Sequence, residues 1–386
     1  MDLTPLRAAM ASSRNKTVQV VADSGQGLSR MARELHETLP NIGVVTQDAE
    51  AHVTLLRDTV IEEVATGLEQ RGVEREEMLR RCTRTLEMCG LADLADRHPT
   101  QLSGGQTRRL AIATVAVLEP QIFVLDNPFA GLDPESSRAI VSLFREMPSE
   151  IVVLGNRVHR ELGSSVLSLR DDSLSLHVPA PQEVSLPAPV AASIAAPIDL
   201  GSVSATRGGA SRRWWQFKAS TQPDFAVGPL PLVVSPSSVV WLRGANGSGK
   251  TTLLRAMAGL DGNDGVSVST SLAFQHAADQ VVDTTISGFI GDAGLISELD
   301  FDPEEHPLDL SASNLRLAQM ASVYVQNRTL MLFDEPDVGL DTCGRTRAHE
   351  MLARCLSGGA ALVMTCHDTS FMDEVGEYAQ VSEVWV

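Results

Sequence analysis

The sequence has little positive charge for its length. Its 386 residues include 31 Lys and Arg against 49 Asp and Glu, which leaves a net charge of −18. Binding to nucleic-acid phosphates requires Lys and Arg to replace counterions, so this balance argues against nucleic acid as a partner. The same shortage argues against direct binding to an anionic lipid surface.

The sequence also lacks long apolar runs, a leader pattern and paired cysteines. No stretch approaches the ~20 apolar residues of a membrane helix, and the N-terminal MDLTPLRAAMASSRNK has no apolar core of a secretory leader. The five cysteines are odd in number and form no CxxC, which argues against a zinc site or a disulfide framework. We expect a soluble chain in a reducing cytosol, which reaches a membrane only through a partner.

What the sequence does contain is one set of motifs that occurs twice. The spacing is 23 positions from Ser103 to Asp126 and from Ser311 to Asp334, and seven positions from Asp126 to Asp133 and from Asp334 to Asp341. This agreement predicts two copies of one parallel α/β unit. Each copy would run strand, phosphate loop, helix, helical insertion, strand, helix, strand.

A proline-rich segment separates the two copies. Residues 177–202 hold five prolines among Ala, Val and Ser, without periodicity. An irregular loop inside one domain is the less favoured interpretation, because so long a loop is uncommon in a compact domain. We expect domains at 1–176 and 203–386, joined by a semi-extended linker over 177–202.

The second copy begins with a strand, a glycine-rich loop and a helix. Apolar residues 239–242 lead into GANGSGKT, Gly244–Thr251, and then into a helical segment. This is the context of a Walker A motif, in which backbone N–H groups and a helix N-terminus bind phosphate. The motif predicts a site for ATP and Mg²⁺, with Lys250 on the terminal phosphates and Thr251 on the metal. The expected nucleotide-binding residues of the loop are Asn246, Gly247, Gly249, Lys250, Thr251 and Thr252.

Two acidic residues end a later apolar strand of the same copy. Asp334 follows residues 329–333, and Glu335 comes next. We expect Asp334 to reach Mg²⁺ and Glu335 to polarise the attacking water, a role worth ~10²–10⁴ in rate. Gln275 and His367 each follow another short strand, at the sheet edge where ligands gather.

The order of these motifs resembles the ATP-binding cassette (ABC) superfamily, over nearly the whole chain except the linker. The first copy supplies the signature LSGGQ at Leu102–Gln106. The resemblance implies two tandem P-loop nucleotide-binding domains, packed head-to-tail. Each would be an α/β domain with a RecA-like parallel sheet, a helical subdomain and a reduced antiparallel β lobe. It also implies nucleotide contacts for the signature residues Ser103, Gly104, Gly105 and Gln106, nucleotide and metal contacts for Gln275, and a catalytic role for His367.

A narrower resemblance is to the ATPases of energy-coupling-factor (ECF) importers. It rests on Thr46–Val73, on His98–Ala113 and on a shorter match at Phe274–Ile286. It implies an ATP-hydrolysing subunit at the cytoplasmic face of the cell membrane. Its partners would be an integral-membrane T-type coupling component and a substrate-binding S-type component, and its cargo a vitamin or a metal ion.

Each copy has lost what the other has kept. In the first, Leu28 replaces the phosphate-binding lysine, Asn127 the catalytic glutamate and Asn156 the histidine. In the second, Ala312 and Ser313 replace the two glycines of the signature. Cassette domains of the family bind nucleotide between the Walker motifs of one domain and the signature of the other. We therefore expect one hydrolytic composite site and one degenerate site per chain, with the intramolecular pair replacing a homodimer.

Several alternatives remain open at this stage. A soluble cassette protein that acts on ribosomes or nucleic acid is disfavoured by the acidic balance, and a non-hydrolysing scaffold by the intact second copy. The helical insertion is longer in the first copy, which indicates either an asymmetric partner or drift without consequence. Three aromatic residues either stack on adenine or pack in an edge strand: Trp214, Trp215 and Phe217.

Overall fold

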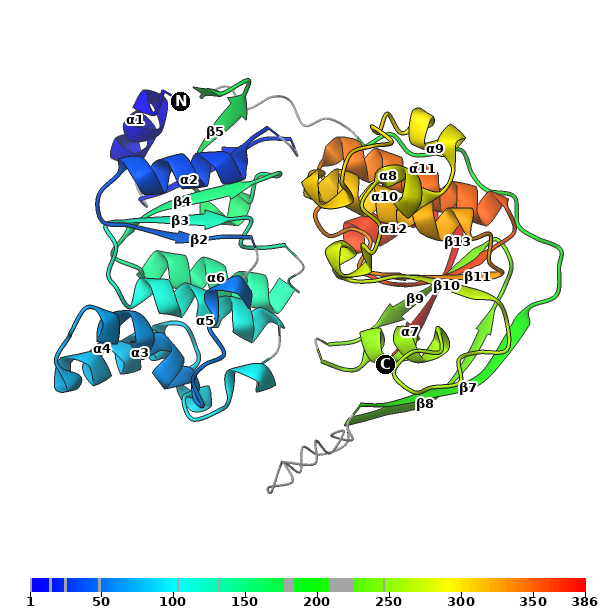
Figure 1. Ribbon diagram of the computed structural model, residues 1–386, viewed down its shortest axis with the longest axis horizontal. Coiled ribbons are helices and arrows are strands. Elements are labelled where there is room, and N and C mark those ends of the chain that lie inside the picture. Colours follow the sequence, from blue (N-terminus) through cyan, green and yellow to red (C-terminus); the bar gives the residue numbers. More distant parts are fainter. Residues whose placement is uncertain are drawn as a thin grey trace. The chain divides into compact units, whose positions relative to one another are not determined.

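The computed structural model describes residues 2–13, 16–23, 26–47, 50–102, 104–130, 132, 134–176, 184–207, 225–245 and 247–386. The chain forms two compact units, Met1–Glu183 (unit 1) and Val184–Val386 (unit 2). Each contains a parallel sheet between helices (Figure 1).

The boundary between the units falls inside the expected linker, but the linker is shorter than predicted at its C-terminal end. Ile198 to Ser202 already belong to strand β7, because they pair with β8. Before β7, the Val190 N–H donates to the Tyr378 carbonyl at 2.7 Å, and Val190 packs on the core of unit 2. These proline-rich residues therefore run along unit 2.

Unit 1 has a six-stranded sheet in the order β2-β3-β4-β1-β5-β6, parallel except for the last pair. Its strands are β1 (Thr17–Val21), β2 (Ile42–Val45), β3 (Ile122–Asp126), β4 (Glu150–Gly155), β5 (Ser165–Arg170) and β6 (Ser173–Ser175). Its α-helices are α1 (Thr4–Ser12), α2 (Leu28–Thr38), α3 (Val60–Gln70), α4 (Arg75–Met88), α5 (Gly104–Ala116) and α6 (Pro134–Glu146).

Unit 2 repeats this plan with a five-stranded parallel sheet in the order β10-β11-β12-β9-β13, plus the antiparallel pair β7-β8. Its strands are β7 (Ile198–Arg207), β8 (Phe225–Val234), β9 (Ser238–Arg243), β10 (Thr270–Ala273), β11 (Leu330–Asp334), β12 (Ala361–Thr365) and β13 (Gln380–Trp385). Its α-helices are α7 (Lys250–Met257), α8 (Ile286–Ile290), α9 (Ala293–Glu298), α10 (Ala312–Val325), α11 (Thr342–Ser357) and α12 (Thr369–Tyr378).

The central strands form because their apolar runs are buried on both faces, as parallel strands require. All five residues of β11 and of β12 are buried. In unit 2, β7, β8 and α7 cover one face of the sheet, and α10, α11 and α12 cover the other (Figure 1). The polar residues that follow the strands therefore meet at one edge of the sheet.

The units differ in what covers the phosphate-loop face of the sheet. Unit 2 uses the β7-β8 pair, through Leu200, Val203 and Leu232. Unit 1 uses helix α1, through Leu6 and Met10, packed against β1 and α2. The expected reduced β lobe is thus the two-stranded sheet of unit 2. None of the helices in the described residues is long and apolar enough to cross a membrane.

Candidate nucleotide site

The phosphate loop of unit 2 connects β9 to α7. Gly244, Gly247 and Gly249 have φ of 159°, 80° and 105°, which side chains rarely adopt. A Cβ at Gly244 would lie 2.6 Å from Ser248 Oγ and 2.7 Å from the Val386 carbonyl. Any side chain at this position would therefore clash, so the loop requires glycine here. Lys250 opens α7 and is buried, and its Nζ donates to the Gly244 carbonyl at 2.8 Å and the Ala245 carbonyl at 3.0 Å.

The carboxylate at the end of β11 lies among hydroxyl groups. Asp334 is 3% exposed, and its Oδ1 accepts a 2.6 Å hydrogen bond from Thr365 Oγ1 on β12. Burial raises the pKa of Asp334, and hydrogen bonds from Thr365 and Thr251 oppose that rise. The same Thr365 hydroxyl accepts from the Glu335 N–H at 2.9 Å, so one side chain positions both acids.

Glu335 lies between the two polar residues that follow the neighbouring strands. Its Oε1 is 3.5 Å from His367 Nε2, and Gln275 hydrogen-bonds its carboxyl group. Burial, followed by the charges of Asp334 and Asp337, raises the pKa of Glu335 to about 8. Its Oε2 is buried and has no hydrogen-bond partner in the protein. A buried oxygen of this kind is free to bind a water molecule or a ligand.

An arginine that motif reading did not select fixes the backbone at Gln275. Arg316 on α10 is 4% exposed and donates to the Phe274 carbonyl at 2.8 Å and to the Gln275 carbonyl at 2.5 Å. In unit 1, Arg108 donates to the Gln47 carbonyl at 3.0 Å from the equivalent position. The signal in the sequence was an arginine five residues after the signature serine in both copies.

At one helix contact of the signature segment, the positions of glycine and serine are swapped between the two units. In unit 1, Gly104, Gly105 and Gln106 open α5, and a Cβ at Gly105 would lie 2.6 Å from Ser136 Oγ. In unit 2 the equivalent pair is Ser313 and Gly344, where a Cβ on Gly344 would lie 1.9 Å from Ser313 Oγ. The contact therefore has room for one side chain. The signature position is glycine in unit 1 and serine in unit 2.

Unit 1 keeps the backbone and the aspartate of a phosphate site but has no lysine at the equivalent position. Gly27 has φ of 90° at the start of α2, and Leu28 packs into the core where Lys250 stands in unit 2. Ser29 Oγ still donates to Asp126 Oδ2 at 2.7 Å, as Thr251 does to Asp334. Burial raises the pKa of Asp126, and no lysine lies opposite it in the sequence alignment.

The expected site residues of unit 2 come together at the carboxyl ends of β9, β10, β11 and β12. They are Gly247, Gly249, Lys250, Thr251, Thr252, Gln275, Asp334, Glu335 and His367. Asn246 in the phosphate loop, Ser103 in the signature and Asp133 lie outside the described residues, as do Trp214, Trp215 and Phe217.

The donor set fits a nucleoside triphosphate with a divalent cation. The loop offers glycines in the conformation that a phosphate cradle requires, beside a buried ammonium group. Thr251, Asp334 and Gln275 supply oxygen atoms, which Mg²⁺ prefers. The unpartnered Glu335 Oε2 supplies an acceptor beside them.

Comparisons with known proteins give the class. Residues 6–130 match the family described as ABC transporter. A putative ABC transporter ATP-binding protein of Saccharolobus solfataricus is 25% identical over 88% of this chain and 76% of its own. The energy-coupling factor transporter ATP-binding protein EcfA2 of Streptococcus thermophilus is 40% identical over 30% of this chain and 41% of its own.

Solved structures share the fold over nearly the whole chain. The archaeal ribosome recycling factor aABCE1, in complex with the stalk protein aP1, covers 96% of this chain and 85% of its own, with a TM-score of 0.58 and 17% identity. A structure named RNase-L Inhibitor covers 94% and 82%, with a TM-score of 0.57 and 16% identity.

The fold is therefore a tandem α/β fold with a parallel sheet in each unit, shared with these solved structures. Residues 6–130, in unit 1, therefore match the ABC transporter ATPase domain, and the chain as a whole is similar to putative ABC transporter ATP-binding proteins.

Proposed function

We propose that this chain is the ATP-hydrolysing motor subunit of an ECF-type importer of a vitamin or a metal ion. It would work at the cytoplasmic face of the membrane, with T-type and S-type membrane components as partners. The observation that carries the proposal is the division of intact parts between the units. Unit 2 brings Lys250, Asp334, Glu335 and His367 together, whereas unit 1 has the glycine-rich signature.

In this proposal Lys250 binds the terminal phosphates, and Thr251, Asp334 and Gln275 hold Mg²⁺. The metal, when bound, neutralises phosphate charge and polarises the terminal phosphate. Glu335 is the base that orients and deprotonates water. Its pKa is raised to about 8, so its carboxyl group holds a proton near neutral pH. That pKa would fall, and the carboxyl group would release its proton, with a Mg²⁺ ion beside Asp334, because a nearby positive charge favours the carboxylate. His367 contacts Glu335 and the transferred phosphate.

The signature of unit 1 would complete this site, and a matched pair of substitutions tests that step. Gly104→Asp places a carboxylate where phosphate would approach, and a Cβ at Gly104 meets nothing within 4 Å. The equivalent change in unit 2 is Ala312→Asp, also at an exposed position. We expect Gly104→Asp to abolish ATP hydrolysis and Ala312→Asp to leave it within about twofold, since surface changes are usually nearly neutral. Equal losses in both variants would contradict a single composite site.

The membrane assignment has its own test. The relative named EcfA2 supports a membrane partner, and the likeness to aABCE1 concerns the fold alone. The chain would be expressed with candidate T-type and S-type components and purified in detergent, and separately applied to ribosomes on a sucrose gradient. We expect a detergent-stable complex and no ribosome binding at physiological salt. Sedimentation with ribosomes, without a membrane complex, would favour the soluble alternative.

A further inference from the structure

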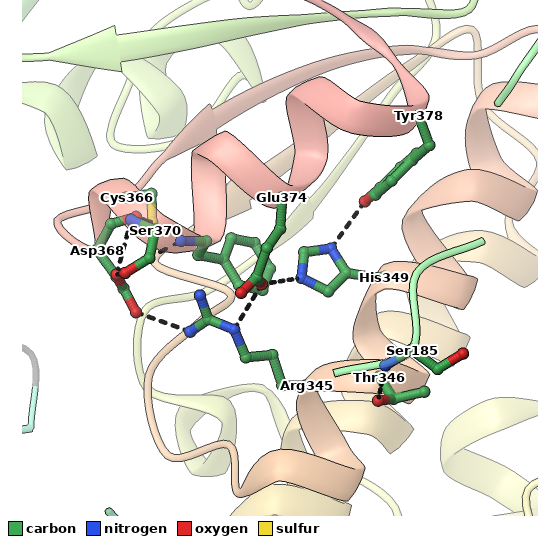
Figure 2. Close-up of polar contacts among 10 residues, drawn as sticks. Ser185, Arg345, Thr346, His349, Cys366, Asp368, Ser370, Glu374 and Tyr378 are labelled. Carbon is green, nitrogen blue, oxygen red and sulfur yellow. Dashed lines mark hydrogen bonds and ion pairs between the residues drawn. The ribbon is translucent and has the colours of Figure 1, made fainter. Parts of the chain in front are cut away.

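A partly buried ionic network in unit 2 includes Asp368, the residue that follows His367 in the sequence (Figure 2). Arg345 on α11 donates through Nη1 to Asp368 Oδ2 at 2.7 Å and through Nε to Glu374 Oε2 at 2.6 Å. The side chains of Arg345 and Asp368 are 11% and 15% exposed. Burial alone would lower the pKa of Arg345, but its hydrogen bonds with Glu374 and Asp368 raise it, so the guanidinium stays charged.

The network continues through a fully buried histidine. His349 lies one turn beyond Arg345 on α11, with Nε2 2.7 Å from Glu374 Oε2 and Nδ1 3.0 Å from Tyr378 Oη. Its ring stacks on Phe371, with ring centroids 4.4 Å apart. Burial lowers the pKa of His349, and the hydrogen bond with Glu374 opposes that shift. These contacts fix α12 against α11.

Asp368 connects this network to the site. Its Oδ1 accepts from the Ser370 N–H at 3.0 Å and so caps α12, while its Oδ2 binds Arg345. On the other side of His367, the Cys366 carbonyl accepts from Trp241 Nε1 at 3.1 Å, and the Cys366 thiol donates to the Asp368 carbonyl. Both neighbours of His367 are therefore held by groups from other elements.

Unit 1 provides an internal comparison for this network. At the positions of Arg345, Asp368 and His367 it has Ser137, Arg157 and Asn156. The equivalent strand and helix, β4 and α6, form without these residues, and β4 is followed by a 3-10 helix at Arg160–Leu162 where unit 2 has α12. Gln19 stands at the position of Trp241 and bonds the backbone of His159. The histidine and the two charged residues Arg345 and Asp368 therefore occur together in unit 2 and are all replaced in unit 1.

We infer that Arg345 is a positioning residue for His367. It joins helix α11, which is capped by Asp341, to the loop that carries the histidine, and so aims the imidazole at Glu335. This inference rests on the proposed function, because His367 matters only if unit 2 hydrolyses ATP. In the described contacts the arginine bonds neither Glu335 nor the phosphate loop, so it acts on His367 through the neighbouring Asp368, with Glu374 as its second partner.

A double-mutant cycle tests this role. Arg345→Gln and His367→Ala would be measured separately and together in steady-state ATP hydrolysis, with ATP in excess over enzyme. Losing an orienting partner typically costs ~10–100-fold in activity, so we expect Arg345→Gln to lower kcat about tenfold and KM for ATP to change less than about twofold. In the His367→Ala background the same change should cost less than about twofold, because the positioned group is gone.

Controls separate positioning from a general loss of structure. Arg354→Gln removes an exposed ion pair with Glu298 from the same helix and should leave kcat unchanged. Arg345→Lys retains the charge and should recover part of the rate. If Arg345→Gln does not fold, Asp368→Asn takes its place in the cycle, because asparagine keeps the N-cap of α12.

Two outcomes would overturn the inference: an equal loss in both backgrounds, or no loss in either. Wild-type hydrolysis and its disappearance in Glu335→Gln are read in the same assay. Their absence would count against the proposed function, whereas their presence with multiplicative losses would count against Arg345 alone.

Discussion

Unit 1 and unit 2 turn the chain in the same way after their central strand, but only unit 2 places an acid at the turn. Asn127 and Glu335 have φ of 50° and 51°, and the N–H of each is bonded to the next strand, at Leu154 and Thr365. The same backbone turn therefore forms with an amide side chain in unit 1 and with a carboxyl side chain in unit 2. A phosphate-loop fold is maintained by its buried strands, and hydrolysis depends on a few side chains added to it.

The largest expected effect comes from giving unit 2 the residue of unit 1. Lys250→Leu removes the ammonium group of the phosphate loop, so the negative charge that develops on the phosphate loses its positive partner. We expect ATP hydrolysis to fall by roughly 10²–10³-fold, as for other lost transition-state contacts. The reciprocal change, Leu28→Lys, should restore none of this rate in the double variant, because Asn127 is no base. Recovery by Leu28→Lys would show that unit 1 still has a working site.

A second prediction concerns the exchanged packing at the signature. Gly105→Ala places a Cβ against Ser136 Oγ and should lower the free energy of unfolding of unit 1 by about 1–3 kcal/mol, the usual cost of overpacking. Chemical denaturation measures this loss. The double change Gly105→Ser with Ser136→Gly copies unit 2 and should restore stability while hydrolysis stays low. Full activity in that double variant would contradict a role for the bare glycine in phosphate approach.

A third prediction concerns acid sensitivity of unit 1. Burial, and then the charge of Arg157, lowers the pKa of His159 to about 4, against 6.5 for the free side chain. Folding favours the neutral ring, so its contribution is complete above pH 6.5 and is lost as the pH falls toward 4. Between pH 7 and pH 5 the free energy of unfolding should fall in the wild-type protein. In His159→Phe we expect this fall to be smaller by about 1–2 kcal/mol. Parallel pH profiles of both proteins would show that another group is responsible.

The smallest expected effect comes from the exposed ion pair between Arg354 and Glu298. Its removal by Arg354→Gln should change the free energy of unfolding of unit 2 by less than about 1 kcal/mol, because solvent screens such pairs. Thermal unfolding at low and high salt checks this value. A larger, salt-dependent loss would mean that surface charge stabilises the packing of α9 on α11. Arg354→Gln could then no longer serve as a neutral control for Arg345→Gln.

Much of the fold follows from local sequence. The apolar strands before Asp126 and Asp334, the glycines of the loop and the end of α11 at Leu356–Gly359 all depend on neighbours in the chain. The role of helix α1 could not be predicted in this way. Only tertiary packing shows that α1 covers the sheet face of unit 1 equivalent to the face that β7 and β8 cover in unit 2. The start of β7 was hidden inside the proline-rich segment.

The supporting residues of the site could not be predicted for the same physical reason. Thr365, Arg316 and Arg345 act on groups 23 or more residues away in sequence, through contacts that only the folded sheet creates. Their types are unremarkable in a helix or a strand. The damage in each copy could be predicted, because aligned motifs place each lost residue beside its intact counterpart.

The most direct measurement of the central claim is the ATPase rate of Glu335→Gln beside that of Asn127→Ala. Both change the same turn, one in each unit. If the chain has one hydrolytic site, the first should lose at least ~10²-fold, the contribution of a positioned base, and the second should keep the wild-type rate. Substantial hydrolysis in Glu335→Gln, or a comparable loss in Asn127→Ala, would contradict the account.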